Sequence, residues 1–303
     1  MAKQEPRPVN GKVVAITGGA RGIGRSTAEA LVREGAKVAI GDLDAELTEQ
    51  VAGEIGGDTV GLPLDVTERE SFAAFLDGVE ERLGPVDVLI NNAGIMPLGD
   101  FAEEDDATTI RIIDINVHGV ITGTKLAVRR MRPRRTGHII NVASMVGKIS
   151  PPGGATYVAS KHAVVGLTES VALENADYGI DFSVVMPVVV RTELGSGLKE
   201  TRGVKSVGPE EVAAAIVDAI KVPKRDVYVP RETGAIHKAT YPLPQRAQMA
   251  VAKAMKSDRI LLDIDHGQRA AYEDRAAHSE PGLEPEGTDE AETVGGEPVE
   301  AAK

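Results

Sequence analysis

Short apolar runs and amphipathic stretches alternate along most of this chain, and this alternation leaves few folds open to it. Residues 13–16 (VVAI) form the kind of apolar run that a buried parallel strand shows. A glycine-rich turn at residues 17–24 (TGGARGIG) follows, and an amphipathic stretch then runs from Arg25 to Arg33. Strand, turn and helix in this order are the context that a dinucleotide-binding turn requires.

The alternation continues as far as residue 229. It predicts further strands at residues 37–40, 59–64, 86–90, 138–142, 181–186 and 227–229, and helices at residues 45–55, 68–82, 107–131, 156–175 and 209–221. Strands that alternate with helices of this length form a parallel sheet with right-handed crossovers. We therefore expect an α/β fold in which a mostly parallel seven-stranded sheet carries helices on both faces.

Beyond the last predicted strand the pattern weakens. We expect an N-terminal lead (residues 1–10), one α/β domain (11–230), a helical C-terminal appendage (231–278) and a disordered acidic tail (279–303). Within the appendage, residues 245–256 predict an amphipathic helix with one apolar stripe, made of Ala247, Val251, Ala254 and Met255. The tail carries eight acidic residues and one basic residue, which accounts for −7 of the net charge of −12, and has almost nothing to bury.

The composition narrows the classes of protein to which the chain can belong. Hydrophobic residues make up 42% of it, which is ample for a core, and no apolar run approaches the roughly 18 residues that cross a bilayer. The first residues lack the hydrophobic stretch of a secretory signal, so we expect a cytoplasmic location. The chain contains no cysteine, which excludes disulfides, thiolate metal sites and cysteine nucleophiles.

Charged and metal-binding side chains give little sign of other partners. The basic run at residues 129–135 (RRMRPRR) is more typical of a helix C-terminus, whose dipole it complements, than of a nucleic-acid contact. His118 and His162 have no further ligand at metal-binding spacing. We expect no nucleic-acid partner and no metal site.

The glycine turn and one acidic residue predict a dinucleotide site. In a Gly-x-x-x-Gly-x-Gly turn that opens a helix, backbone N–H groups can approach a pyrophosphate without a side-chain clash. Asp42 stands at the end of the second predicted strand, where a carboxylate accepts both ribose hydroxyls of the adenosine half and repels a 2′-phosphate. This predicts NAD over NADP, although the basic Arg21 would favour the extra phosphate. The alternative for Asp42 is a helix cap or a solvated loop acid, but Asp44 is the better candidate for the cap of the next helix.

Tyr157 and Lys161 stand four residues apart in the helix predicted at residues 156–175. Residues at this spacing lie on one face of a helix, so that a phenol and an ammonium group can point into one cleft. Ser144 lies thirteen positions before Tyr157. Taken singly, Tyr157 could be a core phenol and Lys161 a solvated helix residue. Together with Ser144 and the glycine turn, they predict hydride transfer on a nicotinamide cofactor.

Between residues 12 and 229 the chain resembles the short-chain dehydrogenase/reductase family, in its compact single-domain branch. The resemblance rests on residues 17–24, Asp42, Asp65-Val66, Asn91-Asn92-Ala93-Gly94, Asn116, Ser144, Tyr157 with Lys161, and Pro187 with Thr192. It implies a doubly wound Rossmann fold, in which Asp65 contacts the adenine, residues 92–94 shape the wall beside the adenosine ribose and residues 187–192 hold the nicotinamide carboxamide. The cofactor contacts implied in this way are Gly18, Arg21, Gly22, Ile23, Gly24, Asp42, Leu43, Asp65, Val66, Asn92, Ala93, Gly94, Tyr157, Lys161, Pro187, Val190 and Thr192.

The resemblance also implies a catalytic set of Asn116, Ser144, Tyr157 and Lys161. We expect Tyr157 to exchange the hydroxyl proton of a secondary alcohol with its ketone, and Ser144 to hydrogen-bond the developing alkoxide. Lys161 would reach the nicotinamide ribose, and Asn116 would hold a water that relays the proton. A free tyrosine has a pKa near 10, which must fall by roughly three units for Tyr157 to act as a base near neutral pH. We attribute that fall to Lys161 and the positive nicotinamide ring.

Two departures from the family pattern concern the pocket and the assembly. Residues 188–190 (VVV) follow Pro187 where the family often has glycine, which narrows the space beside the nicotinamide. Residues 227–230 (VYVP) replace a Val-Asp-Gly-Gly-like segment, which puts the usual tetramer in doubt, although we expect a homo-oligomer, either a dimer or a tetramer. A contact of residues 245–262 with a membrane surface is not favoured, because their charges are mixed.

We therefore predict an NAD-dependent oxidoreductase that interconverts an apolar secondary alcohol and its ketone. The substrate pocket is expected to be lined by Ile95, Met96, Met145, Ile149, Val188 and Val189. A mobile segment at residues 193–208 is expected to cover it. The runner-up is a catalytically idle dinucleotide-binding protein that acts as a sensor or scaffold.

Overall fold

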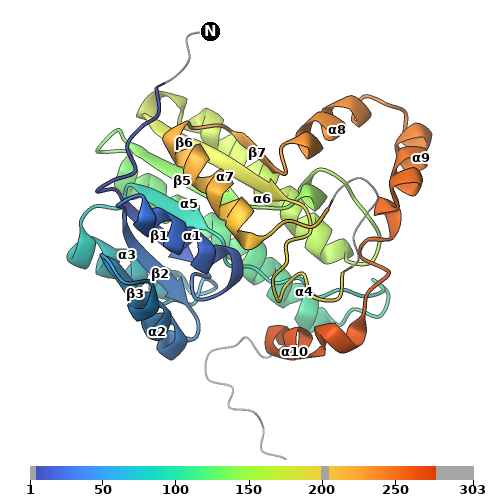
Figure 1. The fold of residues 1–303 in the computed structure, drawn as a ribbon, viewed down its shortest axis with the longest axis horizontal. Coiled ribbons are helices and arrows are strands. Elements are labelled where there is room, and N and C mark those ends of the chain that lie inside the picture. The colour runs from blue at the N-terminus through green and yellow to red at the C-terminus, as the bar shows by residue number, and fades with distance from the viewer. Residues whose placement is uncertain (1–4, 199–204, 278–303) are drawn as a thin grey trace, which may run out of the picture.

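A seven-stranded sheet runs through the computed structural model, which describes residues 5–198 and 205–277 (Figure 1). Its strands are β1 (Val13–Thr17), β2 (Lys37–Asp42), β3 (Thr59–Pro63), β4 (Val88–Asn91), β5 (Gly137–Val142), β6 (Ile180–Pro187) and β7 (Asp226–Val229). Their order is β3-β2-β1-β4-β5-β6-β7, and every neighbouring pair is parallel. The predicted seven-stranded parallel sheet is confirmed.

Helices connect the strands and continue after the last one. They are α1 (Gly22–Arg33), α2 (Ala45–Ile55), α3 (Arg69–Leu83), α4 (Asp106–Ile113), α5 (Val120–Met131), α6 (Ala155–Glu174), α7 (Pro209–Lys221), α8 (Glu232–Thr240), α9 (Gln245–Met255) and α10 (His266–Ala277). Local chemistry sets several of their beginnings. The Asp44 side chain accepts a hydrogen bond from the Leu47 N–H at 3.0 Å and so caps α2, as predicted. Pro209 is the first residue of α7, where its fixed φ suits a first helical turn.

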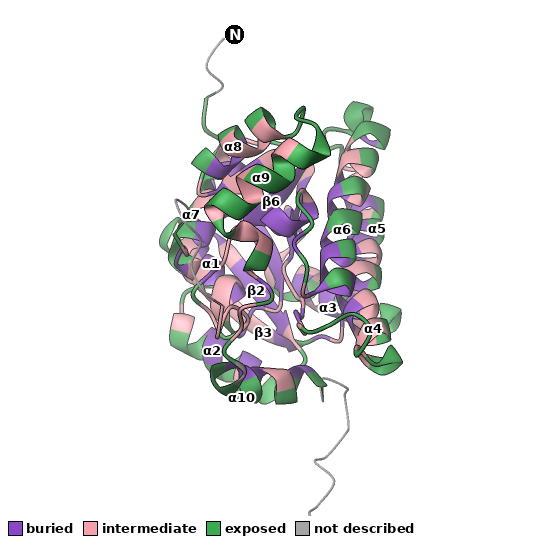
Figure 2. Ribbon diagram, turned by 90° about the vertical axis from the view of Figure 1, so that its right-hand side faces the viewer, coloured by how far each residue is buried: buried purple, intermediate pink, exposed green. Residues whose placement is uncertain are grey.

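Side chains of the sheet enter two apolar layers, because successive residues of a strand point to opposite faces. Ile16 of β1 packs in one cluster with Leu31 of α1. Ala15, its neighbour in the chain, packs in the other cluster with Phe72 of α3. Helices α1, α2 and α7 cover the first face, and α3 to α6 cover the second. Figure 2 shows the buried strands between helices whose outer surfaces are exposed. The sheet is therefore doubly wound.

The helix predicted at residues 107–131 is interrupted. Between α4 and α5 the chain forms a π-helical segment, η1 (Asp114–Gly119). Asn116 of η1 holds the backbone of Ile95: its Oδ1 accepts the Ile95 N–H, and its Nδ2 donates to the Ile95 carbonyl, both at 2.9 Å. A helical pattern in the sequence does not reveal a break that depends on a distant strand end. Such π segments occur frequently at functional sites.

The chain beyond β7 forms three helices. Figure 1 shows α8 and α9 projecting at the upper right, in orange, and α10 returning below the sheet. The amphipathic helix predicted at residues 245–256 is confirmed as α9, but Ala254, which we placed on its apolar stripe, is exposed. Of the predicted cover at residues 193–208, residues 199–204 lie outside the described residues, as does the predicted acidic tail at residues 279–303. Across the described ranges, no helix is both long and apolar enough to span a bilayer.

Candidate active site

A cavity of about 1160 Å³ opens at the carboxyl ends of the strands. It lies over the boundary between β1 and β4, the two adjacent strands from which the sheet grows in opposite directions. Such a reversal leaves a crevice outside the strand ends, because the connections depart to opposite sides. Every residue predicted to contact the cofactor or the substrate, except Gly24 and Asn116, lines this one cavity.

The glycine turn forms one end of the cavity. Gly18 has φ of +63°, and a Cβ at this position would lie 2.9 Å from the Ala93 Cα, so only glycine fits between β1 and β4. Helix α1 begins at Gly22, and its N-cap residue, Arg21, makes no side-chain capping hydrogen bond. The first N–H groups of α1 are thus available to an anion. Gly24 does not line the cavity but packs beneath the turn, where a Cβ would lie 2.1 Å from the Gly18 carbonyl oxygen.

Asp42, the last residue of β2, points its carboxylate at the glycine turn. It accepts hydrogen bonds from the Ala20 N–H at 3.1 Å and from its neighbour Leu43 at 2.9 Å. Burial raises the pKa of Asp42, and these two hydrogen bonds oppose that rise. Arg21 forms an ion pair with the capping residue Asp44, at 3.5 Å between Nη2 and Oδ2. The basic residue of the turn is therefore partly neutralised by an acid beside Asp42.

Asp65 follows β3 and has one carboxylate oxygen without a partner. Its Oδ1 accepts hydrogen bonds from the Thr67 N–H and hydroxyl, at 2.9 and 2.7 Å. Its Oδ2 is buried and makes no hydrogen bond with any of the described residues. Buried polar atoms are nearly always satisfied, and a hydrogen-bond donor of a ligand in this cavity would satisfy this one. The unpartnered oxygen and the glycine cradle both fit a dinucleotide.

The ends of β1 and β4 are held together by Asn92. Its Nδ2 donates to the carbonyl oxygens of Thr17 and Gly18, at 3.0 and 2.9 Å. Its backbone N–H and that of Ala93 donate to the Thr17 hydroxyl, each at 3.0 Å. The side chain of Asn92 thus fixes the wall of the cavity, and Ala93 and Gly94 complete it.

Tyr157, Lys161 and Ser144 meet at the other end of the cavity. Tyr157 and Lys161, both on α6, are only 5% and 6% exposed, and the Lys161 Nζ lies 5.6 Å from the centre of the Tyr157 ring. Ser144 follows β5, and its hydroxyl donates to the Pro187 carbonyl oxygen at 3.4 Å. Of the groups near Tyr157, Ser144 is the one that most lowers the pKa of the phenol. For the Lys161 Nζ, the only hydrogen-bond acceptor among residues 5–198 and 205–277 is the Val142 carbonyl oxygen, at 3.2 Å. An ammonium group has three donors, so a ligand in the cavity could use the others.

Burial shifts both groups toward their neutral forms. It raises the pKa of Tyr157 to about 12, against the hydrogen bond with Ser144 and the charge of Arg269, which oppose that rise. It lowers the pKa of Lys161 to about 8. We expected Lys161 and the positive nicotinamide ring together to lower the pKa of Tyr157. In the chain alone, burial of the phenol outweighs the groups that lower its pKa, and Lys161 is not among those groups. The two side chains are buried more deeply than their spacing in the sequence indicates, and burial disfavours the charged form of each group.

Asn116 does not line the cavity, because its side chain is fully buried. Besides its two hydrogen bonds with Ile95, its Nδ2 donates to the Ser160 hydroxyl at 3.1 Å. Ser160 precedes Lys161 on α6. Asn116 thus ties β4, η1 and α6 together, and one lone pair of its Oδ1 is left for the relay water that we expected it to hold.

The part of the wall that was predicted to hold the substrate is apolar. The segment after β6 contributes Pro187 and Val190, and Val190 pairs with Val207 in an isolated parallel bridge. Thr192 lies against the glycine turn, since a Cβ on Gly22 would be 3.3 Å from the Thr192 Cγ2. All six residues predicted for the substrate pocket line the cavity: Ile95, Met96, Met145, Ile149, Val188 and Val189.

The C-terminal segment supplies wall residues that the sequence did not reveal. Leu261 packs with Tyr157 and Met96 in one apolar cluster. Tyr272 of α10 lines the cavity and accepts the Met96 N–H at 2.6 Å. The only signals were an apolar triplet at residues 260–262 and a single tyrosine within a charged, alanine-rich helix. In the described ranges, no three side chains of His, Asp or Glu gather as metal ligands would.

Known proteins resemble this chain along the part that carries the cavity. A model of the short chain dehydrogenase family matches residues 12–203. The chain is 40% identical to zerumbone synthase of Zingiber zerumbet over 190 residues, which are 61% of this chain and 71% of the relative. It is 36% identical to 3beta-hydroxysteroid dehydrogenase 2 of Eggerthella lenta over 234 residues, which are 71% of this chain and 90% of the relative.

A solved structure gives the same picture. The crystal structure of a short chain dehydrogenase/reductase from Burkholderia phymatum, in complex with NAD, matches with a TM-score of 0.71 at 27% identity. The match covers 78% of this chain and 94% of that one.

We expect the substitution Lys161→Met to stabilise the chain without ligand. Lowering the pKa of Lys161 from 10.5 to about 8 corresponds to roughly 3 kcal/mol of lost folding stability at any pH below about 8. Between pH 8 and 10.5 the unfolded chain keeps this proton and the folded chain loses it, so wild-type stability rises through that window. The variant should therefore be more stable at pH 7, and its advantage should shrink toward pH 10.5.

Urea unfolding at pH 7 and near pH 10 measures this difference. Lys125→Met, at an exposed position on α5, is the control and should change stability little at either pH. A Lys161→Met protein that is less stable than wild type at pH 7 would contradict the burial argument.

Proposed function

The chain belongs to the short-chain dehydrogenase family, and from that premise we propose that it is an NAD-dependent oxidoreductase that interconverts an apolar secondary alcohol and its ketone. One observation carries the proposal. The buried pair of Tyr157 and Lys161, with Ser144 beside it, shares one cavity with a glycine cradle at the reversal of the sheet.

The residues at the cradle fit a nicotinamide dinucleotide. The first N–H groups of α1 would hold the pyrophosphate, Asp42 the adenosine ribose and Asp65 the adenine. At the far end, Lys161 would hold the nicotinamide ribose with the donors that Val142 leaves unused. The bound cofactor would accept a hydride from the substrate carbon in alcohol oxidation and would donate one to it in ketone reduction.

Tyr157 is the proton donor and acceptor in this proposal. With a pKa of about 12, its phenol keeps its proton at neutral pH and can give it to a ketone oxygen. In the direction of alcohol oxidation the phenolate form must accept the proton. The charge of Arg269 favours this form, and Lys161 with the positive nicotinamide ring would favour it further when the cofactor is bound. Ser144 donates to the same substrate oxygen. Asn116 acts as a positioning residue, because it reaches Lys161 only through Ser160 and the backbone.

The walls beside Tyr157 suit an apolar substrate. Met96, Met145, Val188 and Val189 line them, together with Leu261. Such a lining binds an apolar body and orients it through few polar groups. The relative named for a 3β-hydroxysteroid acts, by that name, on a substrate of this kind.

We expect the functional unit to be a homo-oligomer, a dimer or a tetramer. Ile110 on α4 and Leu173 on α6 are large apolar side chains that are 60% and 73% exposed. Apolar side chains in such positions are available to cover one another between copies of the chain.

Replacing Tyr157 by Phe removes the exchangeable proton and keeps the ring. We expect turnover to fall by a factor of about 10² to 10⁴, while the affinity for NADH stays within about twofold, because only one hydroxyl is lost and the other proposed cofactor contacts remain. Steady-state rates and NADH titration measure the two quantities. Tyr178→Phe, which removes a phenol outside the cavity, is the matched control. Wild-type turnover in the Tyr157→Phe protein would refute the assignment.

Asp42 is proposed to select NAD over NADP. Asp42→Asn keeps the shape and removes the charge that repels a 2′-phosphate, so the ratio of kcat/KM for NAD to that for NADP should fall by at least about 10-fold, which corresponds to about 1.4 kcal/mol. Asp58→Asn, an exposed carboxyl before β3, should leave the ratio unchanged. The selectivity assignment is wrong if wild type uses NADP as well as NAD or better.

A further inference from the structure

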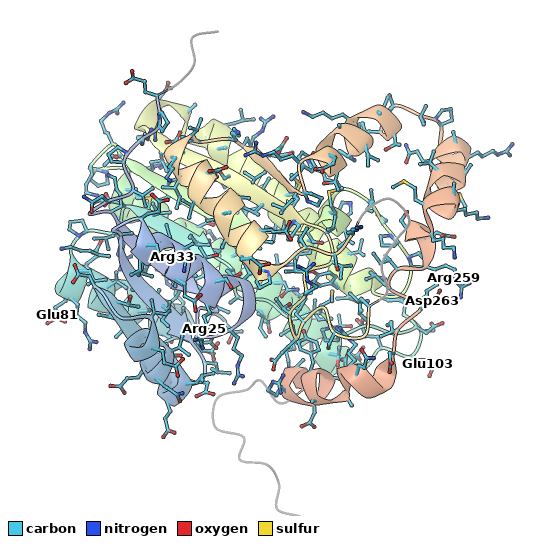
Figure 3. All side chains as sticks on the ribbon, viewed as in Figure 1. Arg25, Arg33, Glu81, Glu103, Arg259 and Asp263 are labelled. Carbon is cyan, nitrogen blue, oxygen red and sulfur yellow. The ribbon has the colours of Figure 1, made fainter. Side chains whose placement is uncertain are left out.

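Residues 257–277, which we call the C-terminal wrap, lie on the chain's own active site. The backbone N–H of Asp265 donates to the Gly197 carbonyl at 2.9 Å, and Arg275 pairs with Glu193 at 2.7 Å. Arg259 and Asp263 of the wrap, labelled beside each other in Figure 3, form an i,i+4 ion pair. The wrap therefore covers the segment that follows Thr192, on the substrate side of the cavity.

The α/β domain has two glycines where the wrap comes closest. Gly153 has φ of +100°, and a Cβ there would lie 2.4 Å from the Leu261 carbonyl oxygen. Gly197 has φ of +73°, and a Cβ there would lie 2.6 Å from the Asp265 carbonyl oxygen. Any side chain at either position would push the wrap away. The α/β domain is thus shaped to receive it.

Arg269 fastens the wrap from inside. It is 1% exposed, and its guanidinium donates to the carbonyl oxygens of Leu194 and Ser196, at 2.8 and 3.1 Å, and to that of Met96. It also pairs with Glu273. A buried charge is costly unless its donors are satisfied. Here the acceptors are two carbonyl groups of the segment after Thr192, that of Met96, and the Glu273 carboxylate on α10. The arrangement holds α10 at a fixed distance from Met96.

Tyr272 is the residue that this arrangement places in the cavity. Its ring lies 4.7 Å from the Arg269 guanidinium carbon, and it is 9% exposed. Its hydroxyl oxygen accepts the Met96 N–H, which fixes the oxygen in place. None of the hydrogen bonds within the described part of the chain uses this hydroxyl as a donor. The proton of Tyr272 is therefore free to reach an acceptor in the cavity.

We propose that Tyr272 donates this hydrogen bond to a second oxygen of the substrate, one that does not react, so that the preferred substrates are apolar ketones or alcohols with a further acceptor oxygen. The proposal rests on the proposed function for what the reacting oxygen is. Tyr272 belongs to the apolar cluster of Ile95 and Ile112, whereas Tyr157 belongs to that of Val146 and Leu261. Besides burial, Tyr157 also contributes to raising the pKa of Tyr272, so the two phenols lie near enough to act on one bound molecule, although their rings pack in different clusters.

Matched ligands test the proposal. Decalone and decalindione form one pair of rigid probes, and androstanone and androstanedione form another; each pair differs in a single carbonyl oxygen. Calorimetric titration onto the full chain, alone and with NAD⁺, which cannot reduce a ketone, measures binding without turnover, so failed hydride transfer would not affect the result. Wild type should bind at least one dione about 10-fold more tightly than its monoketone. Tyr272→Phe should abolish this preference by weakening the dione only.

A merely structural role for Tyr272 gives a different result. If the hydroxyl only holds Met96, Tyr272→Phe weakens both members of a pair alike and the ratio of their affinities stays as in wild type. Tyr178→Phe is the control and should leave every affinity unchanged. The proposal is overturned if wild type shows no preference in either pair, whether it binds both members or neither, or if Tyr272→Phe keeps the preference.

Discussion

The carboxyl ends of β1 and β4 lie side by side, and the sheet grows from them in opposite directions. This geometry leaves the crevice in which all the proposed chemistry takes place. Two features keep the strand ends close enough for it: Gly18, which has no Cβ to meet Ala93, and Asn92, whose amide joins the two ends. The glycine cradle, Asp42, Asp65 and the catalytic pair all take their positions from this boundary.

The second determinant of the site is the exclusion of solvent from its catalytic side chains. Lys161 and Tyr157 are buried together, and each is driven toward its neutral form. A buried cleft of this kind lowers the stability of the folded chain while no ligand is bound. It also strengthens the electrostatic interactions of any charged group that a ligand places in it. The C-terminal wrap contributes to this burial, because Leu261 packs in the Tyr157 cluster. The buried site therefore lowers the stability of the chain without ligand and strengthens its electrostatic interactions with a bound one.

Features encoded by local patterns could be predicted from the sequence. The seven strands and the cap at Asp44 followed from apolar runs and capping chemistry, and most of the cavity lining followed from what the family resemblance implies. What could not be predicted depends on contacts between distant residues. The π segment depends on the hydrogen bonds between Asn116 and Ile95. The C-terminal wrap depends on the hydrogen bonds that Arg269 donates to carbonyl groups far away in the chain. The pKa of Tyr157 follows from burial that no spacing reveals.

The most direct test of the account is an assay of hydride transfer by the wild-type chain. Nicotinamide absorbance would be followed while a panel of apolar secondary alcohols and ketones is offered with NAD(H) and, in parallel, with NADP(H). The account predicts turnover of at least one alcohol–ketone pair, faster with NAD(H). A protein that binds NADH and turns over no member of the panel would contradict it and would identify an idle dinucleotide-binding protein.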